Sequence, residues 1–334
     1  MVSRKTAKND THNLGKLNHI KLVSIPMLRN LAFIFVLIIT LIKLHAAAPT
    51  PYETVMNVAE GKIDITLPDD PIQLTRDDLL HWVKTAANTV SQFYGRFPVP
   101  HLTLRIRSDD RSGVHHGVTY ATNGGLILIS VGRTATIRDL ESDWRMTHEM
   151  IHLAFPNMED DHRWIEEGIS TYVEPVARAQ AGQLTPETVW KEFARDMPQG
   201  QPASGDQGLD NTHTWGRTYW GGALFCLSAD VQIREKTHNR KSLRDALRAI
   251  NSKGNVAEDW DIKKAFAVGD KATGTTVLQN LYREMRDKPT PVDLDSMWQK
   301  LGVELKDGKV IFNDKAPEAS IREAITAQVL NIKP

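Results

Sequence analysis

The sequence predicts an α+β fold, in which a small N-terminal sheet is followed by a mainly helical C-terminal lobe. Short segments that alternate apolar and polar residues recur up to Val131. From Ile137 onward, apolar residues recur at helical spacing instead. We therefore expect an N-terminal α+β sheet lobe over 49–136 and a helical lobe over 137–334. A functional cleft is expected where the two lobes meet.

The N-terminal lobe is predicted to contain short strands and one helix. The strands are the alternating segments at 63–67, 102–107, 117–121 and 126–131. Thr122-Asn123-Gly124-Gly125 is a turn signal between the last two. From Thr75 to Gly95, apolar residues at helical spacing predict the helix.

The C-terminal lobe is predicted to be built from helices and one hairpin. Helical spacing predicts helices over 139–155, 164–181, 215–235, 243–251 and 275–286. Pro175 is expected to kink or split the second of them. Ser242 begins a capping box at the start of the fourth. Lys306-Asp307-Gly308-Lys309 predicts a hairpin over 303–312, and a tail follows it.

Residues 1–48 have the pattern of a secretory leader. A basic region precedes the apolar run LAFIFVLIITLI at 31–42, and Ala46-Ala47-Ala48-Pro49 follows it. This order predicts a signal peptide cleaved after Ala46 or Ala48, and a secreted or periplasmic mature protein. An uncleaved signal anchor, which would attach the protein to the membrane, is the alternative. Met27 would begin a leader of ordinary length, so it is a second candidate start.

Composition gives no reason to expect a nucleic-acid partner, an internal disulfide or a cysteine nucleophile. The 41 basic and 41 acidic residues give no net charge, so nothing predicts a nucleic-acid partner. The single cysteine, Cys226, cannot form an internal disulfide. It lies in an apolar helical pattern, which favours a small buried side chain over a nucleophile.

The segment His148-Glu149-Met150-Ile151-His152 is an HExxH motif. Histidines four residues apart lie on one face of a helix, so both imidazoles can bind one metal ion. Neutral imidazole suits Zn²⁺, and a catalytic zinc site needs a third protein ligand. The following segment Trp164-Ile165-Glu166-Glu167-Gly168 offers two adjacent carboxylates for that position. Two surface histidines on an ordinary helix are the alternative.

HExxH followed by a WxxEG segment resembles the gluzincins, the thermolysin-like zinc peptidases. The resemblance implies a thermolysin-like zincin fold with an edge strand over the cleft. It selects Glu167, the glutamate before the glycine, as ligand to one catalytic Zn²⁺ together with His148 and His152. It also implies that Glu149 is the general base. Gly168 is expected to let the two ligand-bearing helices approach closely, because glycine has no Cβ.

A second motif suggests an oxyanion donor. Tyr219-Trp220-Gly221-Gly222-Ala223 resembles the YxxGA element of the aminopeptidase N and glycyl aminopeptidase families, whose tyrosine stabilises the oxyanion. The resemblance implies that role for Tyr219, and the alternative is an amphipathic ring at a helix start. His213 is a competing or additional donor, because thermolysin uses a histidine for this purpose. The alternative for His213 is an ordinary loop residue.

The edge strand bears on the choice of substrate. Aminopeptidases of this group carry a glutamate there, which holds the free amino group of the substrate. The candidate segments 117–121 and 123–127 contain no acid, and a buried ammonium without a partner is costly. We therefore expect a zinc peptidase that acts as an endopeptidase on peptide or protein substrates. An aminopeptidase and a catalytically inactive peptide-binding module are the alternatives.

Overall fold

The structure is a computed structural model, and it describes residues 52–329. The predicted leader, its cleavage sites and Met27 lie outside the described residues. The described residues group into one compact unit. No helix in the described range is both long enough and apolar enough to cross a membrane.

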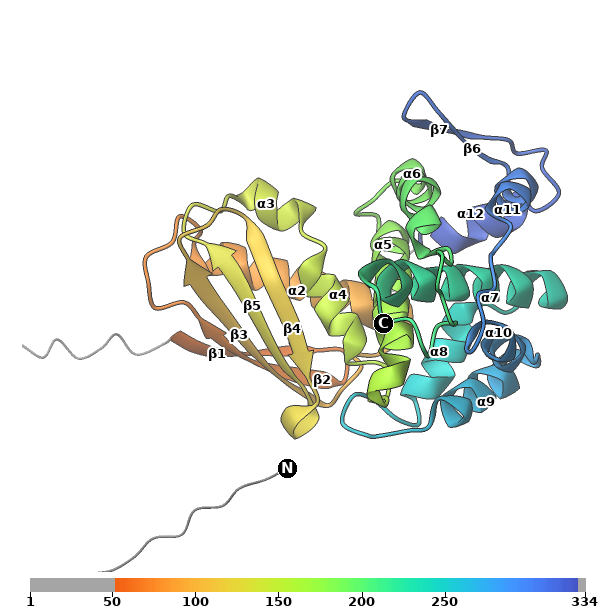
Figure 1. Cartoon of the computed structure of the whole chain (residues 1–334). Helices are drawn as coiled ribbons and strands as arrows, with labels where there is room; N and C mark the ends of the chain where they lie inside the picture. The colour runs from red at the N-terminus through yellow and green to blue at the C-terminus, as the bar shows by residue number, and fades with distance from the viewer. Residues whose placement is uncertain (1–51, 330–334) are drawn as a thin grey trace, which may run out of the picture. The chain divides into compact units, whose positions relative to one another are not determined.

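A mixed sheet of five strands forms the N-terminal part, in the order β1-β2-β3-β5-β4 (Figure 1). The strands are β1 (Tyr52–Val58), β2 (Gly61–Leu67), β3 (His101–Asp109), β4 (Val114–Tyr120) and β5 (Leu126–Gly132). The central strands β2, β3 and β5 are parallel, whereas β1 and β4 pair antiparallel at the two edges. A parallel pair needs a crossover, and α2 (Arg76–Tyr94) supplies it between β2 and β3.

The predicted strands and helix of this region are confirmed, and β1 is an addition. β1 was not expected because its apolar residues do not separate cleanly onto one face. Val55, for example, points outward and is 55% exposed. An edge strand needs only one buried face, so its pattern is weaker than that of the central strands.

The C-terminal part consists of helices and one hairpin. The helices after the sheet are α3 (Ile137–Ser142), α4 (Arg145–His152), α5 (Arg163–Gln180), α6 (Pro186–Asp196), α7 (Gly222–Thr237), α8 (Leu243–Asn251), α9 (Ile262–Thr273), α10 (Val277–Met285), α11 (Leu294–Leu301) and α12 (Ala319–Thr326). Short 3₁₀ segments are η2 (Thr122–Gly124), η3 (Asp160–His162) and η4 (Met197–Gly200). A π-helical turn, η5 (Arg217–Gly221), leads into α7, and β6 (Val303–Lys306) pairs with β7 (Lys309–Phe312).

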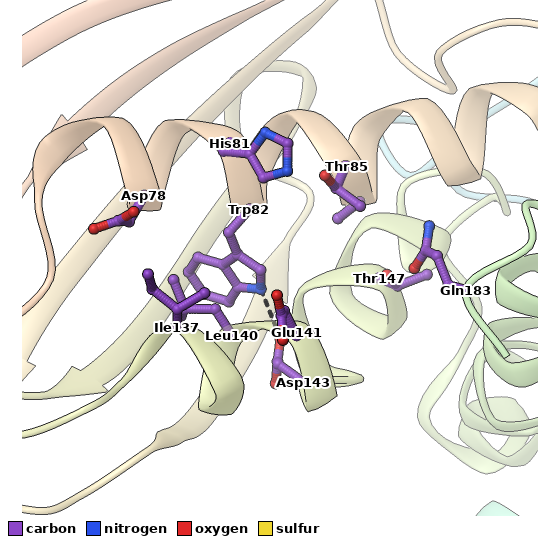
Figure 2. A pocket seen from close by; sticks show the side chains of 11 residues that line it. Asp78, His81, Trp82, Thr85, Ile137, Leu140, Glu141, Asp143, Thr147 and Gln183 are labelled. Atoms are coloured by element: carbon purple, nitrogen blue, oxygen red, sulfur yellow. Dashed lines mark hydrogen bonds between the residues drawn. The ribbon is translucent and has the colours of Figure 1, made fainter.

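The helix predicted over 139–155 is wrong in one respect, because it is two helices. Asp143 has an extended backbone conformation and separates α3 from α4. Its buried carboxylate accepts the backbone N–H groups of Arg145 and Met146, at 3.0 Å each. Aspartate favours this capping geometry over a helix interior. The indole N–H of Trp82 on α2 also donates to Asp143, at 3.2 Å (Figure 2).

Other helix predictions are confirmed or corrected in detail. Pro175 lies inside α5 without splitting it. The capping box at Ser242 and the hairpin over 303–312 are present as predicted. The helices α6, α9, α11 and α12 were not predicted; each is at most 12 residues long. Cys226 is buried in α7, as expected.

Helices α5 and α7 cross at very close range. A Cβ atom added to Gly168 would lie 2.3 Å from the Cα of Gly222, and one added to Gly222 would lie 2.0 Å from the carbonyl oxygen of Trp164. Gly168 was expected to bring α5 close to α4, and this is corrected: its close neighbour is α7. The crossing matters because Gly168 directly follows Glu167, and Gly222 follows the turn that carries Tyr219.

Candidate metal centre

Helices α4 and α5 bring three potential metal ligands together. His148 Nε2 lies 3.3 Å from Glu167 Oε2 and 3.2 Å from His152 Nε2, and His152 Nε2 lies 3.4 Å from Glu167 Oε2. Zinc bonds of about 2.0–2.1 Å in a tetrahedral site separate the ligand atoms by about 3.3–3.4 Å. The three atoms therefore form a nearly equilateral triangle of the size that a tetrahedral zinc ion requires. Within residues 52–329, this is the one such cluster of His, Cys, Asp and Glu side chains.

The surroundings favour the metal-binding protonation state at two of the three ligands. Burial lowers the pKa of His148, which favours the neutral imidazole. Burial alone would raise the pKa of Glu167, but hydrogen bonds from His148 and His152 outweigh it and hold this pKa well below its usual range. At the third, His152, burial would lower the pKa, but the hydrogen bond and negative charge of Glu167 raise it. Arg163, one turn earlier on α5, adds an ion pair to Glu167 at 3.4 Å. The cluster thus combines two imidazoles with an ionised carboxylate.

Glu149 lies against the edge strand β4. The hydroxyl of Thr119 donates to Glu149 Oε2 at 2.7 Å and also approaches its backbone oxygen at 2.9 Å. A Cβ atom added to Gly117 would lie 2.7 Å from both Cγ and Oε1 of Glu149. Gly117 and Thr119 share one face of the strand because side chains alternate. The strand therefore leaves room for Glu149 at one position and fixes its carboxylate at the next.

Tyr219 reaches the cluster from the π-helical turn η5. Its ring stacks on that of His148, with centroids 6.5 Å apart and an interplanar angle of 21°. Burial, together with the nearby carboxylate of Glu167, raises the pKa of Tyr219 to about 12. Its hydroxyl is therefore protonated at neutral pH and can donate a hydrogen bond.

The turn η5 is held from two sides. Arg217 Nε lies 2.7 Å from Asp206 Oδ2, and both side chains are almost wholly buried. On the same side, a Cβ atom added to Gly200 would lie 2.3 Å from the backbone of Trp220. The opposite side is the glycine crossing with α5. These contacts fix the backbone on either side of Tyr219.

A cavity of about 530 Å³ joins these groups. Its lining includes the predicted residues His148, Glu149, His152, Glu167 and Tyr219. Strand β4 contributes 116–120 to the lining, so the edge strand does border the cavity. The lining also includes Asp160 of η3 and two residues in the first turn of α5, Arg163 and Glu166.

His213 does not line this cavity, which favours the alternative that it is an ordinary loop residue. Its side chain is 54% exposed, and its nearest acidic partner is Asp161 at 3.9 Å. The reason lies in the preceding residues. Asp210 accepts hydrogen bonds from the Trp164 indole and the Tyr282 hydroxyl, at 2.8 Å each, and these bonds anchor the loop on the helical side.

Sequence reasoning missed three residues that organise the site: Gly117, Thr119 and Asp143. Gly117 and Thr119 lie on a segment inspected for acids, where only the period-two spacing indicated that they share a face. Asp143 precedes the HExxH helix at a capping position, which is a recognisable signal.

The sequence matches no protein-family model and no curated protein. The fold is nevertheless similar to solved structures. An aminopeptidase N family protein from Idiomarina loihiensis superposes with a TM-score of 0.56 at 12% identity, over 80% of this chain and 53% of that protein. An M1 zinc metallopeptidase from Deinococcus radiodurans gives a TM-score of 0.45 at 13% identity, over 73% of this chain and 54% of that protein.

The chain thus spans just over half the length of these proteins. At 12% identity, the first similarity establishes the fold alone. The chain has the α+β fold of an aminopeptidase N family protein, which is the fold relationship that its resemblance to the gluzincins implies.

Proposed function

We propose that the protein is a zinc-dependent peptidase of the thermolysin-like, gluzincin type. The observation that carries this proposal is the triangle of ligand atoms from His148, His152 and Glu167. These residues would hold one Zn²⁺, which supplies a Lewis acid that polarises the peptide carbonyl and lowers the pKa of a water molecule. Glu149 and Tyr219 line the same cavity as these ligands, and a substrate peptide would bind in that cavity.

The residues of the chain divide the remaining chemistry between them. Glu149 accepts a proton from the attacking water and passes it to the leaving amine. Thr119 holds the Glu149 carboxylate in place through its hydrogen bond. The hydroxyl of Tyr219 donates a hydrogen bond to the oxyanion that develops on the carbonyl oxygen.

Endopeptidase activity is favoured by the edge strand. Among the β4 residues that line the cavity there is no carboxylate to hold a substrate amino group. As an edge strand, β4 can still pair with an extended peptide through its backbone. Binding through the backbone does not require a free amino terminus, so internal peptide bonds are accessible.

Aminopeptidase activity is the second candidate, because one observation favours it. The lining of the cavity includes two acids outside β4, Asp160 of η3 and Glu166 of α5, and either could pair with an ammonium group. A catalytically inactive peptide-binding module is the third candidate.

Glu149→Gln tests the function. This variant should keep zinc bound, as measured by metal analysis, and should lose hydrolysis of a diverse peptide library followed by mass spectrometry. Glu159→Gln, a carboxylate outside the cavity lining, is the matched control and should behave as wild type. Equal degradation by wild type and Glu149→Gln would overturn the peptidase proposal. Peptide binding without cleavage by wild type would favour the binding module.

The same library settles the choice between the two peptidase types. Half of the peptides carry an acetylated amino terminus. Cleavage of the acetylated peptides at internal bonds is expected of an endopeptidase. Stepwise loss of single residues from the free peptides alone would establish the aminopeptidase.

We further propose that the enzyme acts outside the cytoplasm, on the strength of the leader pattern over 27–48. Sequencing of the mature amino terminus tests this. A terminus near Ala47 or Pro49 supports export with cleavage, whereas a retained apolar run supports the membrane-anchored alternative.

A further inference from the structure

A second cavity adjoins the metal centre, and the proposed chemistry does not use it. It measures about 590 Å³ and lies among residues of α5, α6 and η5. Its lining shares Trp144, His148 and Tyr219 with the first cavity, so the two meet at the metal cluster. A peptide whose carbonyl lies at the cluster can therefore extend the side chain of a flanking residue into this space. We call it the acidic side pocket.

Aromatic side chains form part of the wall of the acidic side pocket. Trp215 and Trp144 line it and are 60% and 43% exposed, although tryptophan is usually well buried. The Trp215 ring stacks on Tyr219, with centroids 5.7 Å apart. Exposed aromatic faces next to a cavity can pack on the methylene stem of a long side chain, and they attract a cation.

Acidic side chains outnumber basic ones in the lining of the pocket. The titratable acids are Glu141, Glu174, Glu192 and Asp196, and the single permanent cation is Arg178. Arg178 pairs with Glu174 at 2.9 Å, and Arg195 pairs with Asp196 from outside the lining. Glu192, in contrast, has no ion pair or hydrogen bond to any described residue. Burial, reinforced by Asp196, raises the pKa of Glu192, although Arg195 and Arg178 oppose the shift.

One buried oxygen of the pocket also lacks a donor. Glu174 is only 5% exposed, its Oε1 pairs with Arg178, and no described group donates to Oε2. The unpaired Glu192 and this unpaired oxygen, in a half-enclosed space, favour a ligand that donates hydrogen bonds and carries positive charge.

We propose that the acidic side pocket binds the cationic side chain of a lysine or arginine that flanks the scissile bond. Glu192 is the specificity-determining residue that pairs with the cation, and Trp215 contacts the methylene stem. The proposed enzyme is then selective for basic peptides. This inference rests on the proposed peptidase function, because that function places a peptide at the cluster.

Matched peptides test the selectivity. The peptides differ at a single position, where the residue is lysine, norleucine or glutamate. One series varies the residue before the scissile bond, and a second series varies the residue after it. Wild type should cleave the lysine peptide with a kcat/KM about tenfold above that for norleucine. Glu192→Gln, which keeps the shape and removes the charge, should lower kcat/KM for the lysine peptide much more than for the norleucine peptide, so that most of the preference is lost. Glu187→Gln, on an exposed position of the same helix, should keep it.

Binding provides a readout that does not depend on turnover. Calorimetry with the Glu149→Gln protein should give tighter binding of the lysine peptide than of the norleucine peptide, and Glu149→Gln/Glu192→Gln should not. Equal values for lysine and norleucine in wild type would overturn the pocket proposal, as would an equal loss for both peptides in Glu192→Gln. If no peptide is cleaved but the lysine preference in binding persists, the peptidase function fails and the pocket stands.

Discussion

The hydroxyl of Thr119 donates to the carboxylate of Glu149 across the boundary between the sheet and the helices, at 2.7 Å. The same oxygen lies 2.9 Å from the backbone oxygen of Glu149, so Thr119 bridges the side chain and the main chain of one residue. A helix residue is thus oriented by a strand residue thirty positions earlier. Two residues away on the same strand face, Gly117 leaves room for the carboxylate.

Thr119→Val is expected to lower kcat about tenfold, because the general base loses the donor that orients it. KM and zinc content should change little, since neither the cluster nor the peptide-pairing backbone is altered. Thr119→Ser retains the hydroxyl and should restore most of the rate. Steady-state kinetics and metal analysis of the three proteins check this. A valine variant with wild-type kcat would show that Thr119 does not position Glu149.

Tyr219→Phe is expected to lower kcat about a hundredfold with zinc still bound, because one oxyanion donor is removed. His213→Ala should keep near wild-type kcat, since His213 lies outside the cavity lining. The pair of variants therefore compares the two donors that the sequence suggested. A large loss in His213→Ala with a small loss in Tyr219→Phe would reverse the assignment.

Gly222→Ala is expected to destabilise the fold by about 3 kcal/mol, because its Cβ would overlap the backbone of α5 and force the helices apart. The overlap places the Cβ 2.0 Å from the carbonyl oxygen of Trp164. Gly274→Ala is the control, with nothing within 4 Å and a φ of +70°, so it meets only the backbone penalty. That penalty is about 1 kcal/mol. Urea unfolding measures both, and equal losses would show that the crossing is not tightly packed.

Glu174 predicts a pH dependence of stability. Burial raises its pKa from the usual 4.5 to about 8, although Arg178 opposes the shift. A carboxyl whose pKa is raised by folding contributes stability that is present below pH 4.5 and is lost as the pH rises towards 8. Glu174→Gln cannot ionise, so the fall in unfolding free energy across this window should be smaller in the variant.

Each unit of pKa shift corresponds to about 1.4 kcal/mol of unfolding free energy. This value sets the size of the difference expected between wild type and Glu174→Gln. Urea unfolding of wild type and Glu174→Gln at pH 5 and pH 8 measures it. Glu187→Gln should follow wild type at both values. Parallel pH profiles for wild type and Glu174→Gln would show that Glu174 titrates as it does in the unfolded chain.

Much of the fold follows from local patterns in the sequence. The central strands and the longer helices bury one face over several residues, and that periodicity is visible without a structure. β1 was missed because its apolar residues do not lie on one face, and Val55 is exposed. Helices α6, α9, α11 and α12 were also missed, although α8 and α10, of nine residues each, were predicted. Asp143 divided a helix that periodicity alone joined, because a side-chain cap competes with continuation of the helix.

The sequence by itself predicted the candidate metal ligands, because His148 and His152 lie one helical turn apart and the resemblance to the gluzincins selects Glu167. Only the tertiary structure decided which distant residues meet them. It brought Thr119 onto Glu149 and Tyr219 onto His148, placed His213 outside the first cavity, and opened a second cavity beside the cluster. The physical reason is that helix spacing is set by local backbone geometry, whereas contacts between remote side chains depend on how closely whole elements pack.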